Sequence, residues 1–247
     1  VLDALGSPVL APLTLRFASP EDGGPSGLFA NLSHAEDVAL DSNGVATSSI
    51  FTANSQLGEY LVTVSSPGIT SGNIPLSNFA WYVRTDGNDA NSCSSPDLPC
   101  LTINNAIAKA KTGDTIYVAE GRYSGATIRI TTSVKIIGSW KPDFSARGGA
   151  TIIDNQKAAI GVANSAFNSL LARIIIENSN GGLSNSSSIT LDQVAIINNL
   201  GMGIYNDGIY ESTLTITNSP ISQLQDGGLY SDIGPVTINN STIAGNG

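Results

Sequence analysis

The chain has 247 residues, carries a formal net charge of −9 and contains only 13% charged residues, against roughly 25% in an ordinary soluble domain. An acidic chain offers no basic surface that could displace counterions from phosphates, so nucleic acid is excluded as an expected partner. No apolar run approaches the ~18 residues that span a bilayer, so no transmembrane segment is expected.

Residues 1–79 are predicted to form an antiparallel β-sandwich. Asn43-Gly44 predicts a tight turn, because both residues tolerate a positive φ. Three short runs alternate apolar and polar residues or are rich in β-branched residues, and clusters of turn-forming residues separate them. These runs are LTLRF (13–17), VATSSIF (45–51) and EYLVTVSS (59–66).

The same segment resembles the bacterial immunoglobulin-like domains of invasin-type surface proteins. The resemblance rests on DALGSPVLAPLTLRF (3–17) and DSNGVATSSIFTANSQLGEYLVTVS (41–65). In that family, the stretch that DALGSPV resembles follows the first core strands, so the resemblance implies a domain that lacks them. The sequence also begins at Val1 without a leader pattern, so we expect a processed or trimmed piece. Either the strands were left out of this chain, or another chain supplies them by strand addition.

Cys93 and Cys100 are the only cysteines, and the only histidine, His34, lies far away in the sequence. A metal site would need further cysteine or histidine ligands nearby. A disulfide is therefore predicted, with a pair of reduced core cysteines as the alternative. Disulfides persist in oxidising compartments, so we expect the protein to be extracellular or on the cell surface.

Residues 102–111 are predicted to form a single amphipathic helix. Thr102 is a suitable N-cap, and Gly113 follows the last turn as a stop signal. Strand-like runs come directly after it, in TIYVAEGRYS, ATIRI and SVKIIGSW. The helix is expected to cover the open first coil of a β structure. Its apolar residues recur at helical spacing and are Ile103, Ala106, Ile107 and Ala110.

From about residue 150 a loose repeat predicts a parallel β-helix. The segments SITL (188–191), TLTI (213–216) and VTI (236–238) recur at similar intervals, from Ile189 to Leu214 and from Leu214 to Val236. Short strands separated by Asn- and Gly-rich corners, with a period of roughly 23 residues and no helix, are typical of this solenoid. The residues expected to point inward are Ile175, Ile189, Leu191, Ile196, Leu214, Ile216, Ile221, Val236 and Ile238. The residues expected at corners are Asn178, Asn198, Asn218 and Asn239.

The segment from Trp81 to Gly125 looks like the start of β-helix domains of bacterial surface proteins, which have the pectate-lyase-like fold in the broad sense. The stretch KIIGSWKPDFSARGGATIIDNQ (135–156) adds to this resemblance, and the coils at 178–247 are similar to those of polymorphic outer-membrane-type proteins. The predicted fold is all-β: an Ig-like β-sandwich over 1–79, then a right-handed parallel β-helix over 80–247 with an N-terminal capping α-helix.

Two groups of residues are candidate binding sites. In DGNDAN, hard oxygen ligands could suit calcium, although Ala90 departs from the EF-hand spacing and such clusters are also plain turns. No cofactor is expected apart from this possible calcium ion, whose candidate ligands are Asp86, Asn88, Asp89 and Asn91. Tyr205 and Tyr230 are separated by about one period of the repeat and are expected to stack on one face. They could bind surface glycans, or they could stack only as part of the solenoid.

The predicted function is that of a non-enzymatic extracellular structural protein: a cell-surface stalk, an adhesin or a filament subunit that assembles head to tail. Its expected partners are copies of itself or neighbouring domains of a longer chain. The alternative is a polysaccharide lyase, a hydrolase or a glycan-binding module, since the same fold hosts such enzymes. Those enzymes need clustered acids, with a basic residue in the lyases. After residue 158 the chain has one basic residue, Arg173, and the acids Asp207 and Asp232 are about one period apart and could stack, although such a pair is also typical of a solvated corner. No catalytic residue is therefore predicted.

Overall fold

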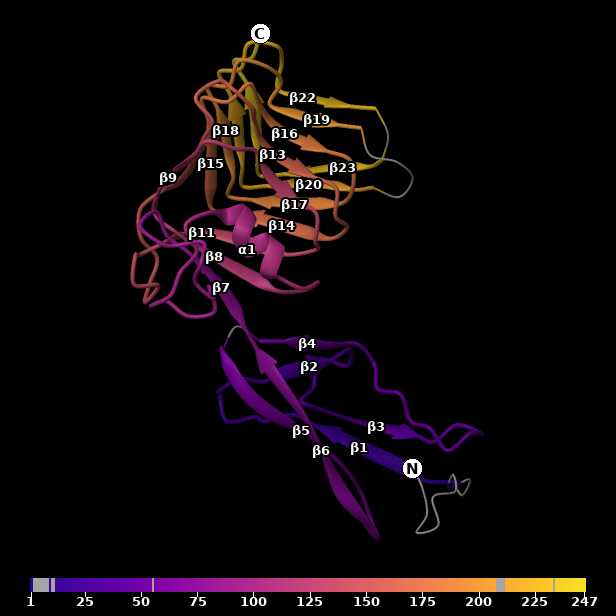
Figure 1. The fold of residues 1–247 in the computed structure, drawn as a ribbon. Coiled ribbons are helices and arrows are strands. Elements are labelled where there is room, and N and C mark those ends of the chain that lie inside the picture. The colour runs from indigo at the N-terminus through magenta and orange to yellow at the C-terminus, as the bar shows by residue number, and fades with distance from the viewer. Residues whose placement is uncertain (2–8, 10–11, 55, 208–211, 233) are drawn as a thin grey trace. The chain divides into compact units, whose positions relative to one another are not determined.

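A computed structural model describes residues 1, 9, 12–54, 56–207, 212–232 and 234–247. The chain divides into two compact units, Val1–Phe79 and Ala80–Gly247 (Figure 1). Of the DALGSPV stretch, only Val9 lies within the described residues. Within the described part of the chain, no helix has the length and apolar character needed to cross a membrane.

The first unit consists of two antiparallel sheets. The larger sheet has the order β3-β1-β5-β6 and the smaller one pairs β2 with β4. Their strands are β1 (Thr14–Ala18), β2 (Gly27–Phe29), β3 (Ala35–Ala39), β4 (Phe51–Ala53), β5 (Gly58–Ser66) and β6 (Ile69–Asn78). A small core joins the sheets and contains Leu15, Phe17, Phe29, Tyr60 and Val62. This arrangement is consistent with a sandwich.

The run 45–51, expected to be a strand, contributes only Phe51 to one. A side chain takes the place of a strand partner here, because the Glu36 carboxylate accepts hydrogen bonds from the Ser49 backbone N–H at 2.6 Å and from its hydroxyl at 2.8 Å. The predicted turn just before this run is present. Gly44 has a φ of 76°, and its N–H donates to the Asp41 carbonyl at 3.1 Å.

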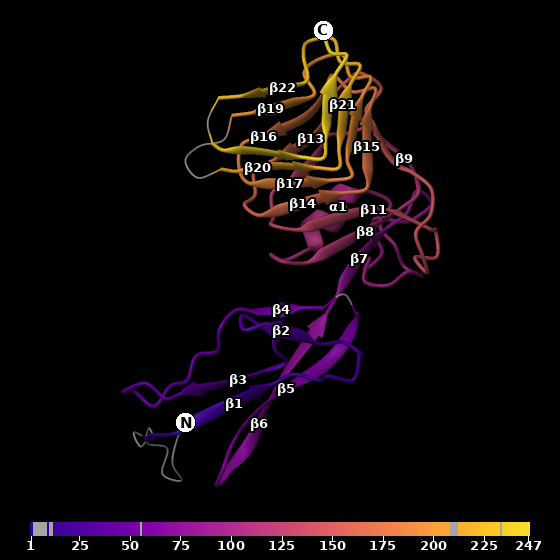
Figure 2. The same ribbon diagram turned by 180° about the vertical axis from the view of Figure 1, so that it is seen from behind.

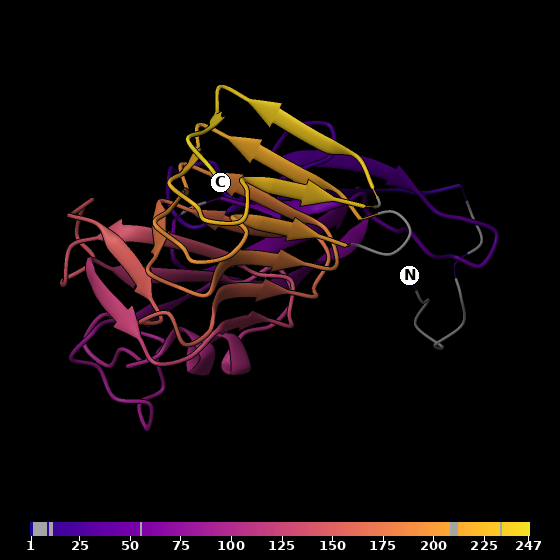
Figure 3. The ribbon, with the colours of Figure 1, turned by 90° about the horizontal axis from the view of Figure 1, so that it is seen from above.

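The second unit is a parallel β-solenoid, in which each coil contributes a strand to up to three parallel sheets (Figures 2 and 3). One sheet contains β7 (Ala80–Val83), β8 (Thr115–Ala119), β11 (Lys135–Trp140), β14 (Ser169–Ala172), β17 (Ile189–Asp192), β20 (Leu214–Thr217) and β23 (Val236–Asn239). The next contains β9 (Gly121–Ser124), β12 (Thr151–Asp154), β15 (Ile174–Glu177), β18 (Ala195–Ile197), β21 (Pro220–Ser222) and β24 (Thr242–Ala244). The third contains β10 (Ile128–Ile130), β13 (Ile160–Asn164), β16 (Gly181–Asn185), β19 (Ile204–Asn206) and β22 (Leu229–Ser231).

Branched aliphatic side chains form continuous rows inside the solenoid. Leu171, Leu191 and Ile216 lie in register on adjacent strands and are fully buried. One inward prediction was wrong. In β15 the buried residues are Ile174 and Ile176 rather than Ile175. Ile238 is in register with Ile216 but 44% exposed, because β23 pairs on one side only within the described residues.

The corners bend through residues in the left-handed conformation, which asparagine tolerates better than most residues. The predicted corner residues Asn178, Asn198 and Asn218 have φ values of 48°, 54° and 54°. Asn239 was wrongly expected at a corner: it ends strand β23, and Asn240 makes the corner with a φ of 46°. The prediction was off by one position because the strand extends through Asn239 before the chain turns.

A row of asparagines, not anticipated from the sequence, lies buried at the ends of three strands. The Asn164 amide donates to Asn185 Oδ1 at 2.7 Å, and the Asn185 amide donates to Asn206 Oδ1 at 2.6 Å. All three side chains are at most 2% exposed. Each amide both donates and accepts, so the row continues from coil to coil without leaving a buried polar group unsatisfied.

The predicted capping helix is present as α1 (Ile103–Lys109). The Thr102 hydroxyl accepts a hydrogen bond from Asn105 N at 3.2 Å, as expected of an N-cap. The buried face of the helix, which includes Ile103 and Ile107, joins the same apolar core as the coils. The disulfide between Cys93 and Cys100 lies just before α1 and has a Cα–Cα distance of 5.0 Å.

Candidate functional site

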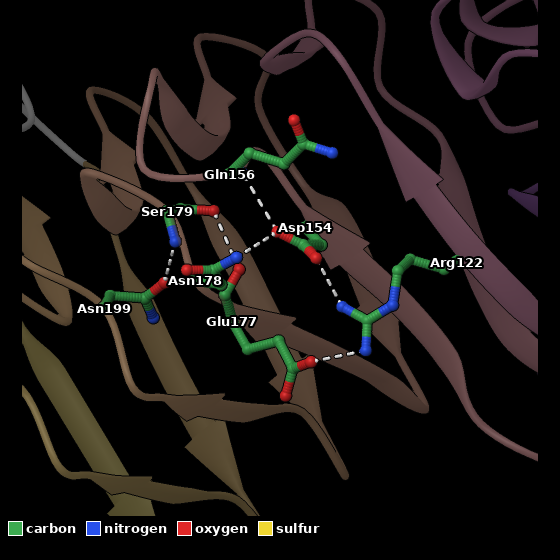
Figure 4. Close-up of polar contacts among 7 residues, drawn as sticks. All are labelled: Arg122, Asp154, Gln156, Glu177, Asn178, Ser179 and Asn199. Carbon is green, nitrogen blue, oxygen red and sulfur yellow. Dashed lines mark hydrogen bonds and ion pairs between the residues drawn. The ribbon is translucent and has the colours of Figure 1, made fainter.

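A charged cluster lies on the outer face of the sheet that contains β9, β12 and β15, and each of these strands supplies one residue. Arg122 Nη1 donates to Asp154 Oδ2 at 2.5 Å, and Arg122 Nη2 donates to Glu177 Oε1 at 2.9 Å (Figure 4). Asp154 and Glu177 are register partners on adjacent strands. One guanidinium therefore neutralises carboxylates from two neighbouring coils.

The Asp154 carboxylate is held in its ionised form. Its side chain is only 9% exposed, and this burial raises the pKa. Hydrogen bonds from the Gln156 backbone N–H at 2.9 Å and the Asn178 amide at 2.8 Å, together with Arg122, outweigh the effect of burial. The net pKa of Asp154 lies below its ordinary value. A carboxyl group of this kind is a poor proton donor at neutral pH.

The neighbouring corners are fixed by a second set of hydrogen bonds. Asn199 Oδ1 accepts from the Ser179 backbone N–H at 2.9 Å, and the Asn199 amide donates to the Ile176 carbonyl at 3.1 Å. Asn199 is 1% exposed, so these bonds are shielded from water. They tie one corner to the coil before it and hold the neighbouring side chains in place.

The cluster forms part of the wall of an open groove of about 600 Å³. Four polar side chains on the groove make no hydrogen bond or ion pair with any other part of the described chain: Lys157, Asn198, Gln223 and Gln225. The other lining residues are Arg122, Asp154, Glu177, Asn178, Asn199 and Leu200. The groove thus combines a satisfied ionic cluster with uncommitted donors and acceptors.

No set of acids grouped with a basic residue on one face was predicted, and the cluster of Arg122, Asp154 and Glu177 corrects this expectation. The basic residue of the cluster, Arg122, lies before the Asn- and Gly-rich coils, in which the only basic residue after residue 158 is Arg173. A signal was present, since Asp154 and Glu177 are separated by one period of the repeat. Residues one period apart occupy equivalent places on neighbouring coils.

The structure places the candidate calcium ligands in turns around the start of α1. Asp89 Oδ1 accepts from the backbone N–H groups of Leu101 and Thr102 at 3.0 and 2.9 Å. Asp89 Oδ2 accepts from the Thr102 hydroxyl at 2.9 Å, so both oxygens support the start of the helix. Asp86 pairs with Arg84 Nε at 2.5 Å.

The two amides of the motif are also engaged. Asn88 Oδ1 accepts from Ala90 N, and the Asn91 amide donates to the Pro99 carbonyl, both at 2.9 Å. Among the described residues, no group of three or more His, Cys, Asp or Glu side chains could hold a metal ion. Calcium binding by this motif stays a prediction.

Tyr205 and Tyr230 lie side by side on the outer face of β19 and β22. Their rings are stacked, with centroids 5.1 Å apart and an interplanar angle of 8°, and the residues are 43% and 42% exposed. The structure therefore brings the pair together, while glycan binding by it stays a prediction. Asp207 and Asp232 follow the two strands, and both are exposed.

No family model, curated protein or solved structure matches the chain in the three comparisons. The resemblances to invasin-type and β-helix surface proteins therefore stay predictions.

Proposed function

We propose that the chain is a non-enzymatic structural part of an extracellular protein, such as a cell-surface stalk, an adhesin or a filament subunit. The observation that carries this proposal is the use of polar side chains to join coils to one another. Arg122 links three successive strands, and the buried asparagine row links three more. The low charge content and the disulfide between Cys93 and Cys100 are further support.

The bacterial Ig-like character of residues 1–79 is part of the same proposal. Two antiparallel sheets around a shared aromatic core support it, with Phe29 and Phe51 ring centroids 4.8 Å apart. Sandwich domains of this class are common in cell-surface proteins. The solenoid would add an element that extends along one direction, because each of its coils stacks on its neighbours.

Head-to-tail association with copies of the same chain is the mode of assembly that we propose. In a parallel solenoid each coil hydrogen-bonds to the next through its backbone, and the same ladder would join one copy to another. Electron microscopy of the native material, prepared without dissociating steps, together with fractionation of the source cells, tests the proposal. Filaments or surface-attached stalks in the extracellular fraction are expected. A cytoplasmic protein found only as discrete particles would refute it.

A carbohydrate-active protein is the second candidate, and the exposed tyrosine pair favours its glycan-binding form. Aromatic rings of this kind could contact sugar rings. Binding that is lost in Tyr205→Ala and Tyr230→Ala, with folding unchanged by circular dichroism, would support it. A lyase or hydrolase is less well supported, because Asp154 has a lowered pKa and Arg122 occupies both carboxylates of the cluster.

A further inference from the structure

We propose that the groove along the corner after β12, β15, β18 and β21 binds an uncharged oligosaccharide. This inference goes beyond the structural function proposed above and does not depend on the tyrosine pair. It assigns a ligand class to a surface that the proposed assembly does not use.

The charge of the groove favours a neutral ligand. The groove contains two cations, Arg122 and Lys157, and two anions, Asp154 and Glu177, so their charges sum to +2 − 2 = 0. The whole chain has a net charge of −9, so the groove is a locally neutral region of an acidic protein. Arg122 is already paired with both carboxylates, and a metal ion would have to displace it. A neutral ligand needs no net charge in the groove, and it does not have to displace Arg122 from the carboxylates.

The hydrogen-bonding capacity of the groove favours a sugar. The side-chain amides of Asn198, Gln223 and Gln225 each offer two donors and an acceptor, and none of these side chains bonds to another described residue. Sugar hydroxyls also both donate and accept. Leu200 is the one apolar side chain in the wall, so an apolar peptide would find little to bury against it.

The spacing of the corner residues favours an extended ligand. Asn178, Asn198 and Gln223 are equivalent corner residues on successive coils, with φ values of 48°, 54° and 59°. Neighbouring strands in a sheet lie about 4.8 Å apart, so these side chains form a regular row along the solenoid. A row of similar polar groups suits an extended chain of similar units better than a compact molecule. Because the backbone of the corners is already fixed, little conformational entropy would be lost when a ligand binds.

A matched pair of variants tests the site. Gln223 and Gln193 both occupy left-handed corners, with φ values of 59° and 56°, but only Gln223 lines the groove. Glycine keeps both backbones relaxed. Binding to an array of glucan, mannan and galactan hexasaccharides is measured for the full chain, Gln223→Gly and Gln193→Gly. Uronate hexasaccharides form a second set on the same array.

We expect uncharged hexasaccharides to bind, with affinity reduced about fivefold by Gln223→Gly, the loss of roughly one hydrogen bond. Adding Gln225→Ala should weaken binding further, and Gln193→Gly should leave it unchanged. Binding restricted to uronates, or dependent on Tyr205 and Tyr230 instead of Gln223, would overturn the inference, as would no binding to any glycan. None of these results bears on assembly, which microscopy tests separately.

Discussion

Removing Asn185 from the buried asparagine row should destabilise the solenoid strongly. The side chain is fully buried and takes part in three hydrogen bonds: from the Asn164 amide at 2.7 Å, to the Ser187 carbonyl at 2.6 Å and to Asn206 Oδ1 at 2.6 Å. In Asn185→Ala all three bonds are lost, and the partner atoms remain in an interior that water does not reach.

The magnitude follows from these contacts. Each hydrogen bond contributes about 1 kcal/mol net, and a buried partner left unsatisfied costs about 1–3 kcal/mol. Because Asn164 keeps an acceptor in the Ala166 carbonyl at 3.1 Å, we expect a total loss of about 3–4 kcal/mol. The free energy of unfolding of native domains is about 5–15 kcal/mol, so the variant should still fold but be much less stable.

Urea unfolding provides the assay. Both tryptophans, Trp81 and Trp140, lie in the solenoid, so their fluorescence follows this unit alone. With a urea dependence of about 2 kcal/mol per molar, the midpoint should fall by about 1.5–2 M. Asn180→Ala is the control, since Asn180 is exposed and makes no side-chain hydrogen bond in the described chain. Circular dichroism should report the same midpoints.

A midpoint for Asn185→Ala that matches the Asn180→Ala control would refute the reasoning. Water or a shifted backbone would then satisfy the partner atoms, and the row would not be a major source of stability. A fall in circular dichroism without a change in fluorescence would show that distant coils unfold separately from those near the tryptophans.

Three further predictions concern the segment before α1. Reducing the disulfide, or replacing Cys93 and Cys100 by serine, should lower stability by about 2–3 kcal/mol; an unchanged melting temperature under reductant would contradict this. Burial raises the pKa of Asp89, but hydrogen bonds from Thr102 and Leu101 outweigh it, and the net pKa is lowered from 3.8. Its contribution is therefore present at neutral pH and lost as the pH falls below about 3.8 through the folded pKa. Asp89→Asn should cost about 1 kcal/mol at pH 7 and show a smaller loss of stability on acidification, and equal losses in both proteins would argue against this role. Because the oxygens of Asp89 are already bonded, a chelator should leave the melting temperature unchanged, and a rise of several degrees in calcium would instead support calcium binding.

The sequence was sufficient to predict the solenoid, because the apolar residues that fill its interior recur at a nearly constant period along the chain. The capping helix was equally clear, since Ile103 and Ile107 form an apolar stripe behind a threonine N-cap. The phase of individual strands was harder to predict. At the corner after β14, Arg173 takes a left-handed conformation with a φ of 56°, and the inward alternation restarts at Ile174. If the alternation of inward and outward residues is continued across that corner without a restart, it wrongly predicts that Ile175 points inward.

The candidate site was less accessible to sequence reasoning. Arg122 lies one coil before its partner Asp154 and two coils before Glu177, and it is not the register partner of either, since Ile152 pairs with it in the sheet. Only the length and direction of the arginine side chain bring the three together. The binding capacity of the groove likewise depends on which corner side chains have hydrogen-bond partners. Those partners are set by the packing of the coils and cannot be predicted from the spacing of residues in the sequence.

The burial of Asn185 also has a consequence for producing the protein. Asn185-Ser186-Ser187 matches the acceptor pattern for N-linked glycosylation. In a eukaryotic secretory host, an oligosaccharide attached to this asparagine before folding would block the interior position that its amide must occupy. Molecules glycosylated at Asn185 would therefore be unable to form these coils correctly, whereas Ser187→Ala would abolish the glycosylation pattern and keep the Asn185 side chain. The Ser187 carbonyl that accepts the Asn185 amide belongs to the backbone and would be retained.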